Sequence, residues 1–128
     1  MALKITLKPN ERTIIGGAII RNGRTKTDFI IENKVPILRE KDIISEEEAD
    51  SPCLRIYFII QLMYVDESNL KLYHKRYWKE VQDILAAAPS MLKFVDPISD
   101  HILHTHYYQA LKLTKELIEY EKELLNVQ

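Results

Sequence analysis

The feature that most constrains the fold is a change in the spacing of apolar residues near Ser45. Before it, apolar and polar residues alternate over short runs such as "LKITLK" (3–8), which turn residues separate. After it, apolar residues recur every three or four positions. The first spacing is typical of β-strands and the second of amphipathic helices. We therefore predict an α+β protein, with a small antiparallel β module over residues 1–44 and a C-terminal helical bundle over residues 45–128.

Five short segments of the β module have the pattern of strands, and turn residues separate them. They are "LKITLK", "RTII", "AIIRN", "TDFIIEN" and "VPIL". In the first, Leu3, Ile5 and Leu7 would share one face, and Lys4, Thr6 and Lys8 the other. Gly16-Gly17 supplies a tight bend, and Asn22-Gly23 is the strongest hairpin signal in the chain.

The helical half shows start and stop signals at several points. Ser51-Pro52 predicts the start of a helix over about 52–65, because a capping hydroxyl precedes proline at the first helical position. Asn69 is a candidate cap for a helix over about 70–88. A last helix is expected over about 98–126, with a break near His104 left open.

The last helix carries a long apolar stripe that approximates a heptad seam. Such a seam packs either inside the chain or against a partner chain. For the second case we assign four residues to an association surface, with a dimer as the expected state. They are Leu111, Leu117, Ile118 and Leu124.

Charge is distributed unevenly along the chain, although the net charge is only −1. Residues 1–44 hold nine Lys or Arg and five Asp or Glu, a balance of +4, whereas residues 45–128 have a balance of −5. Such asymmetry indicates that the basic module faces a polyanion, whereas the acidic part of the chain has a different function. The segment "PILREKDII" (36–44) concentrates charges of alternating sign in the basic part.

Motifs for catalysis and metal binding are weak or absent in the sequence. It has no Gly-x-Ser-x-Gly elbow and no glycine-rich phosphate loop, and a single cysteine, Cys53, excludes an intramolecular disulfide. The cluster Asp100, His101, His104 and His106 has ligand-like spacing, but polar surface histidines are the preferred interpretation. We predict no enzyme activity, no cofactor and no metal.

The sequence favours a cytoplasmic protein that does not enter the membrane. The first residues include a charged side chain at Lys4 and no long apolar stretch follows, which is unlike a signal peptide. The longest apolar run, "IYFIIQLMYV" (56–65), is far too short to span a bilayer.

Four blocks of the sequence resemble the FlbT family of flagellar biosynthesis repressors. They are "LKPNERTIIGGAIIRN" (7–22), "LREKDI" (38–43), "RIYFIIQLMYVDE" (55–67) and "YYQALKLTKELIEYE" (107–121). The resemblance implies a post-transcriptional regulator that associates with the 5′ untranslated leader of flagellin mRNA and promotes its decay. It also implies action together with the small flagellar regulator FlaF. The alternative is an adaptor or chaperone-like factor of flagellum assembly that acts through FlaF or flagellin.

The segments "ITLKPNERTIIGG" (5–17) and "ILREKDI" (37–43) are also similar to the CsrA carbon storage regulators. In that family the first strand and an arginine of the later segment bind RNA, which implies a CsrA-like β module here. If the strand of Arg39 lies beside the first strand, the lysines and this arginine form one basic edge. The expected RNA-binding residues are Lys4, Thr6, Lys8, Arg12, Arg39 and Lys41. A solvated charged turn remains the alternative.

Overall fold

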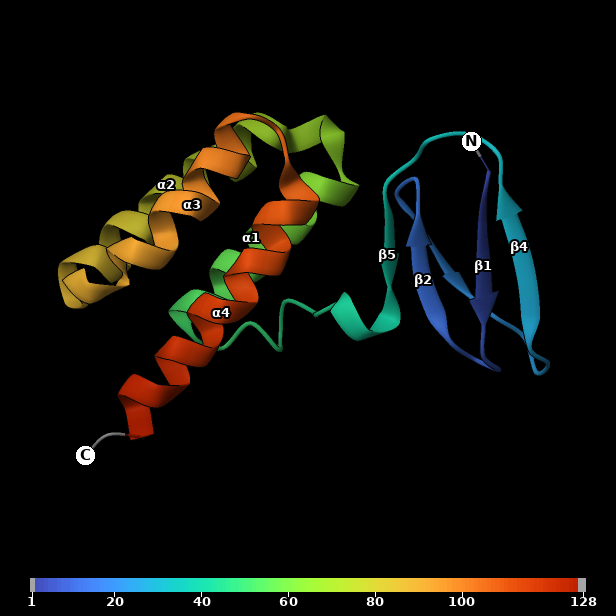
Figure 1. Cartoon of the computed structure of the whole chain (residues 1–128), viewed down its shortest axis with the longest axis horizontal. Helices are drawn as coiled ribbons and strands as arrows, with labels where there is room; N and C mark the ends of the chain where they lie inside the picture. Colours follow the sequence, from blue (N-terminus) through green and yellow to red (C-terminus); the bar gives the residue numbers. More distant parts are fainter. Residues whose placement is uncertain (1, 127–128) are drawn as a thin grey trace. The chain divides into compact units, whose positions relative to one another are not determined.

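The computed structural model describes residues 2–126, and the chain forms two compact units whose boundary falls between Ile43 and Ile44. The regular secondary structure of the first unit consists of strands and one short 3-10 turn, and the second unit contains four α-helices (Figure 1). The predicted α+β class is therefore confirmed.

The β unit consists of two antiparallel sheets, one of two strands and one of three. The strands are β1 (Leu3–Leu7), β2 (Arg12–Ile15), β3 (Ala18–Arg21), β4 (Thr27–Ile31) and β5 (Ile37–Arg39). β1 pairs with β4, and the second sheet has the order β3-β2-β5. The β2–β3 hairpin turns at Gly16 and Gly17, whose φ angles are 57° and 86°. Positive φ at both central positions defines the turn that matches strand twist, which explains the glycine pair.

The expectation of a hairpin at Asn22-Gly23 is wrong, because β3 pairs with β2 while β4 pairs with β1. The side chain of Asn22 is instead buried. Its Nδ2 donates to the carbonyls of Leu7 (3.2 Å), Lys8 (2.8 Å) and Thr25 (3.0 Å). Asn22 thus donates to carbonyls at the end of β1 and in the segment before β4, and it joins these two parts of the chain.

The core of the β unit is small. Its buried apolar side chains are Ile5, Leu7, Ile14 and Leu38. Buried Thr13 donates its hydroxyl proton to the Leu38 carbonyl at 3.0 Å, so β2 and β5 are joined by a side chain as well as by the ladder. Leu3 lies on the inward face as predicted but is 53% exposed.

The helical unit contains α1 (Pro52–Val65), α2 (Leu70–Ala87), α3 (Leu92–Leu103) and α4 (Tyr107–Asn126), with short 3-10 turns at Glu67–Asn69 and Pro89–Met91. The 3-10 turn of the β unit is Glu40–Asp42. Ser51 caps α1 as predicted, since its hydroxyl accepts from the Leu54 N–H at 3.2 Å. The side chain of Asn69 does not cap α2. Asp66 serves this region instead, because its carboxylate accepts from the Ser68 N–H at 3.1 Å.

The region predicted as one last helix over about 98–126 forms two helices, α3 and α4. α3 begins at Leu92, earlier than predicted, so Pro97 lies inside the helix and not before its start. Proline at this position removes one backbone hydrogen bond. The helix nevertheless buries Val95, Ile98 and Ile102, and this packing outweighs the lost bond. The break near His104 is confirmed, since α3 ends there and Thr105 has a φ of 59°.

Within the helical unit, α1 packs against both α2 and α4, and α4 also packs against α3. Leu111, Leu117 and Ile118 are at most 9% exposed in this core. Packing inside the chain therefore accounts for these three residues, and the folded chain does not offer them as the predicted association surface. Leu124 is 40% exposed and is the one member of that set a partner can reach in the folded chain.

Within residues 2–126, no helix combines the length and the apolar content that crossing a membrane requires.

Candidate nucleic-acid interface

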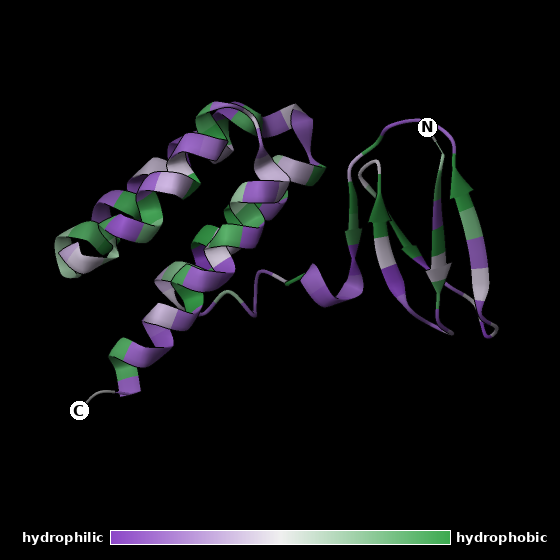
Figure 2. Ribbon diagram, viewed as in Figure 1, coloured by the Kyte–Doolittle hydropathy of each residue, from purple (hydrophilic) through white to green (hydrophobic). Residues whose placement is uncertain are grey.

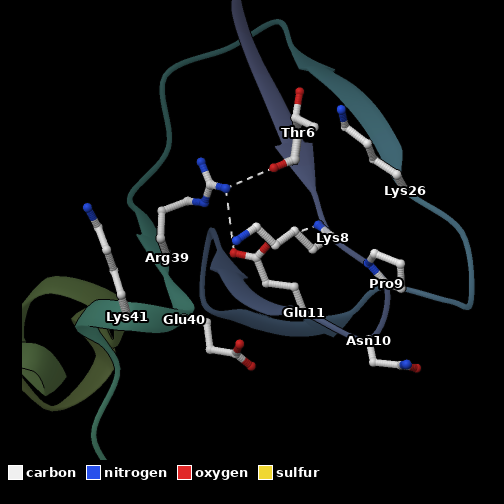
Figure 3. A pocket seen from close by; sticks show the side chains of 9 residues that line it. All are labelled: Thr6, Lys8, Pro9, Asn10, Glu11, Lys26, Arg39, Glu40 and Lys41. Atoms are coloured by element: carbon white, nitrogen blue, oxygen red, sulfur yellow. Dashed lines mark hydrogen bonds and ion pairs between the residues drawn. The ribbon is translucent and has the colours of Figure 1, made fainter.

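The β unit contains an open cavity of about 740 Å³. Its wall comes from the end of β1, the turn that follows, the residue before β4 and the charged segment at the end of β5 (Figure 3). The lining residues are Thr6, Lys8, Pro9, Asn10, Glu11, Lys26, Arg39, Glu40 and Lys41.

Both carboxylates of this cavity are already compensated. Glu11 accepts from the Lys8 backbone N–H at 2.8 Å, and its Oε2 lies 3.5 Å from Nη2 of Arg39. The hydrogen bond and the guanidinium hold the pKa of Glu11 below its ordinary value of 4.5. Glu40 accepts from the Arg12 N–H at 3.1 Å and pairs with the Arg12 side chain at 3.6 Å.

The three lysines of the cavity make no ion pair within residues 2–126, in contrast to the two carboxylates. Lys8, Lys26 and Lys41 are all largely exposed. In Figure 3, Lys41 and Lys26 stand on opposite sides of the cavity, with Arg39 and Lys8 between them. Solvated ammonium groups spread in this way can hold phosphates without first breaking an internal salt bridge.

Arg39 links the two sheets of the unit. The condition set for a basic edge, that the strand of Arg39 lies beside β1, is not met by strand pairing, because β5 pairs with β2. Its side chain nevertheless crosses to the other sheet, where Nη2 donates to the Thr6 carbonyl at 2.8 Å. Nε is buried and has no partner among residues 2–126, so Nη1 carries the donors that remain for a ligand. Arg39 therefore contributes to the framework of the cavity as well as to its charge.

The structure brings four of the six expected RNA-binding residues to this cavity, namely Thr6, Lys8, Arg39 and Lys41. Lys4 is not in the lining, and its Nζ lies 3.7 Å from Asp28, whose carboxylate also accepts the Thr6 hydroxyl proton at 2.7 Å. Arg12 is outside the lining too, since it pairs with Glu40.

Lys26 lines the cavity but was absent from the expected set. Leu7 lies opposite Thr27 in the β1–β4 ladder, so the next positions, Lys8 and Lys26, are neighbours by register. The only signal for Lys26 would have been the pairing of the first strand with the fourth. Nothing in the local sequence records that pairing.

Among the residues that the structure describes, no aromatic side chain lines the cavity. Sequence-tolerant binding of single strands commonly uses aromatic side chains on which bases stack. This cavity therefore suits contacts to phosphates and polar edges. Most aromatics of the helical unit pack with one another, as in the Tyr64–Tyr108 and Phe94–Tyr120 ring pairs.

The other candidate reactive groups have structural environments. Cys53 is buried, and burial together with nearby Glu121 raises the pKa of its thiol, which opposes thiolate formation. Among residues 2–126, no three His, Cys, Asp or Glu side chains converge in a way that would hold a metal ion. His104 bonds to the Asp100 carbonyl of its own helix at 2.8 Å.

The fold and the cavity define an α+β protein with a basic, open pocket on a small β unit. Residues 3–125 match the family model described as "Flagellar protein FlbT", and the chain belongs to this family.

The chain is similar to relatives of this family over nearly its whole length. It is 40% identical to the "Probable flagellum biosynthesis repressor protein FlbT" of Rhodopseudomonas palustris, over 98% of this chain and 99% of that one. It is 35% identical to the "Flagellum biosynthesis repressor protein FlbT" of Caulobacter vibrioides, over 98% of this chain and 90% of that one. No solved structure matches the chain.

Proposed function

We propose that this chain represses flagellum biosynthesis at the level of mRNA. In this proposal the β unit binds the 5′ untranslated leader of flagellin mRNA, and decay of that transcript follows from recruitment of a nuclease, since the chain itself acts without catalysis. The repressor role is supported by the names that its relatives carry. The observation that carries RNA binding is the cavity lined by Lys8, Lys26 and Lys41, three lysines that make no ion pair within residues 2–126.

The arrangement of charge suits a flexible single strand. The ammonium groups extend across an open cavity rather than converging on one point (Figure 3), so they can follow successive phosphates. Asn10 in the same lining has an amide that can bond to a base edge, as has Nη1 of Arg39. Affinity would come mainly from the lysines, and discrimination between leaders from the polar groups beside them.

The test is a filter-binding titration of the purified full-length protein with a flagellin leader RNA across a salt series. Each of Lys8→Ala, Lys26→Ala and Lys41→Ala should lower the magnitude of the log–log salt slope by about 0.7, which is the value per phosphate contact to a single strand. The matched control is Lys75→Ala, an exposed lysine of α2. Unchanged slopes in the three folded variants, with binding lost in Lys75→Ala, would contradict the proposal.

An adaptor or chaperone-like role through FlaF or flagellin is the second candidate. It is favoured by the acidic helical half and by the exposure of Leu124 and Leu125 at the end of α4. A folded triple variant, with alanine at Lys8, Lys26 and Lys41, separates the two candidates in cells that lack the native gene. Repression of flagellin that persists in this variant would favour the adaptor.

A further inference from the structure

The apolar stripe of α4 continues beyond the helices that cover it. Leu117 and Ile118 are 0% and 9% exposed, whereas Leu124 and Leu125, seven residues later on the same faces, are 40% and 65% exposed. The last turn of α4 therefore presents two leucines to solvent. Figure 2 colours part of the ribbon near this end of α4 as hydrophobic. We call this turn the α4 end (residues 122–126).

A groove elsewhere on the helical unit has the size and chemistry to receive such side chains. It has a volume of about 350 Å³ and lies between α1, α2 and the turn at 46–49. Ala49, Phe58 and Ile59 supply apolar surface, and Ala49 and Phe58 are partly exposed. The charged lining residues are Glu46, Arg55, Arg76, Lys79 and Glu80.

The charges of the groove and of the α4 end are complementary. Glu80 is already paired with Arg55 at 3.3 Å, whereas Arg76 makes no ion pair with a carboxylate in residues 2–126. On the α4 end, Glu123 is exposed and likewise makes no ion pair among those residues, while Lys122 pairs with Glu119 at 3.3 Å. Each surface thus has apolar side chains beside a charge that makes no ion pair in residues 2–126, namely Arg76 in the groove and Glu123 on the α4 end, and these two charges have opposite sign. Glu46, on the rim of the groove, also makes no ion pair among those residues.

The two surfaces also lie at the same end of the helical unit. Glu121 accepts from the Ser51 hydroxyl at 2.6 Å and from the Cys53 N–H at 3.1 Å, so the end of α4 adjoins the start of α1. Arg55, which lines the groove, is two residues beyond Cys53. A single two-fold axis can therefore bring the α4 end of each copy to the groove of the other, which closes the assembly at two chains.

We propose that the chain forms such a dimer, in which Leu124 and Leu125 of one copy enter the α1–α2 groove of the other and Glu123 pairs with Arg76. A helix end that lays apolar residues into a groove is a common recognition mode. The mixed charge of the rim, with Glu46 and Glu80 beside the cations, suits such a helix end better than a polyanion.

The first test is sedimentation velocity of the full-length protein over a concentration series, in which the parent should dimerise. Leu125→Glu and Arg76→Glu should each raise the dimer dissociation constant about tenfold or more. The reason is that the dimer contains two identical contacts between an α4 end and a groove, and each substitution disrupts the centre of both. The matched controls are Leu103→Glu, a leucine at the end of α3 that is 66% exposed, and the exposed Lys71→Glu of α2. Both controls should dimerise like the parent.

The second test uses the reciprocity of the contact. Leu125→Glu retains an intact groove and Arg76→Glu retains an intact α4 end, so a mixture should form heterodimers with one complete contact where neither variant dimerises alone. The double variant Arg76→Glu with Glu123→Arg should dimerise more tightly than Arg76→Glu.

Several outcomes would overturn the dimer. They are a parent that is monomeric throughout, folded variants that dimerise like the parent, and a mixture that fails to associate, which would indicate pairing of α4 with α4. Loss of RNA binding in Arg76→Glu with unchanged dimerisation would assign the groove to a polyanion instead.

Discussion

The β unit buries four apolar side chains within the described part of the chain, whereas the helical unit buries eighteen. The β unit compensates with polar links between segments that are distant in sequence. Asn22 donates to three backbone carbonyls, Thr13 donates to the Leu38 carbonyl, and Arg39 donates to the Thr6 carbonyl of the other sheet. The helical unit depends instead on continuous apolar packing of α1 with α2 and α4.

As a consequence, a residue that holds the β unit together can also line the cavity proposed to bind a ligand. Arg39 lines the cavity and also joins the two sheets, so its replacement should affect folding and binding together. The side chains of Lys8, Lys26 and Lys41 make no hydrogen bond or ion pair in the described residues. Lys8 and Lys26 attract Glu11 and Asp28 only at longer range, so replacing these lysines should cost the β unit little stability. Substitutions that separate binding from stability should therefore be chosen among the lysines.

The largest expected effect comes from removing packing in the helical unit. Leu117→Ala leaves a cavity at a fully buried site and should cost about 2–5 kcal/mol in the free energy of unfolding. Chemical denaturation followed by the fluorescence of Trp78, the single tryptophan of the chain, measures this cost. Leu124→Ala, seven residues along the same helix and 40% exposed, is the matched control. Equal losses in the two variants would contradict the core described for this unit.

The next effect tests whether polar links replace a core in the β unit. Asn22→Ala leaves the Leu7, Lys8 and Thr25 carbonyls without their donor and should destabilise this unit by about 1–3 kcal/mol. Amide hydrogen exchange at Thr13 in β2 reports the β unit alone. Exposed Asn33→Ala should have little effect on the same measurement.

A smaller effect is expected where the helical unit itself uses a polar link. Glu121→Gln removes the negative charge that α4 places at the start of α1, and should destabilise the helical unit by about 1–2 kcal/mol. Trp78 fluorescence during denaturation again gives the measurement. The exposed Glu119→Gln is the control, and a loss of the same size there would mean that the position of the charge is unimportant.

The smallest effect concerns the acid stability of the β unit. A carboxyl group whose pKa is lowered by folding stabilises the folded state above its ordinary pKa, and this contribution is lost as the pH falls through the lowered value. For Glu11 the loss should begin near its ordinary value of 4.5 and continue below it. Glu11→Gln should therefore lose less stability in this range than the parent, as measured by hydrogen exchange at Thr13. A parent and variant with parallel pH profiles would contradict this role, and exposed Glu32→Gln is the control.

Much of the local structure could be predicted from the sequence. The strand "RTII" and the helix at 52–65 have the expected bounds, because alternation, helical spacing and the Ser51-Pro52 start signal act within a few residues. The Gly16-Gly17 turn was predictable for the same reason, since its positive φ angles are a local demand.

The partners of these elements were decided only by the tertiary structure. Pairing of β1 with β4 places Lys26 beside Lys8, and pairing of β5 with β2 sends Arg39 across to Thr6. Strand order depends on burial and loop closure between distant segments, which no local pattern records. Burial of Leu111, Leu117 and Ile118 inside the chain was undetermined for a related reason. A helical stripe specifies an apolar face, but only the surrounding helices determine whether the chain itself or another molecule covers it.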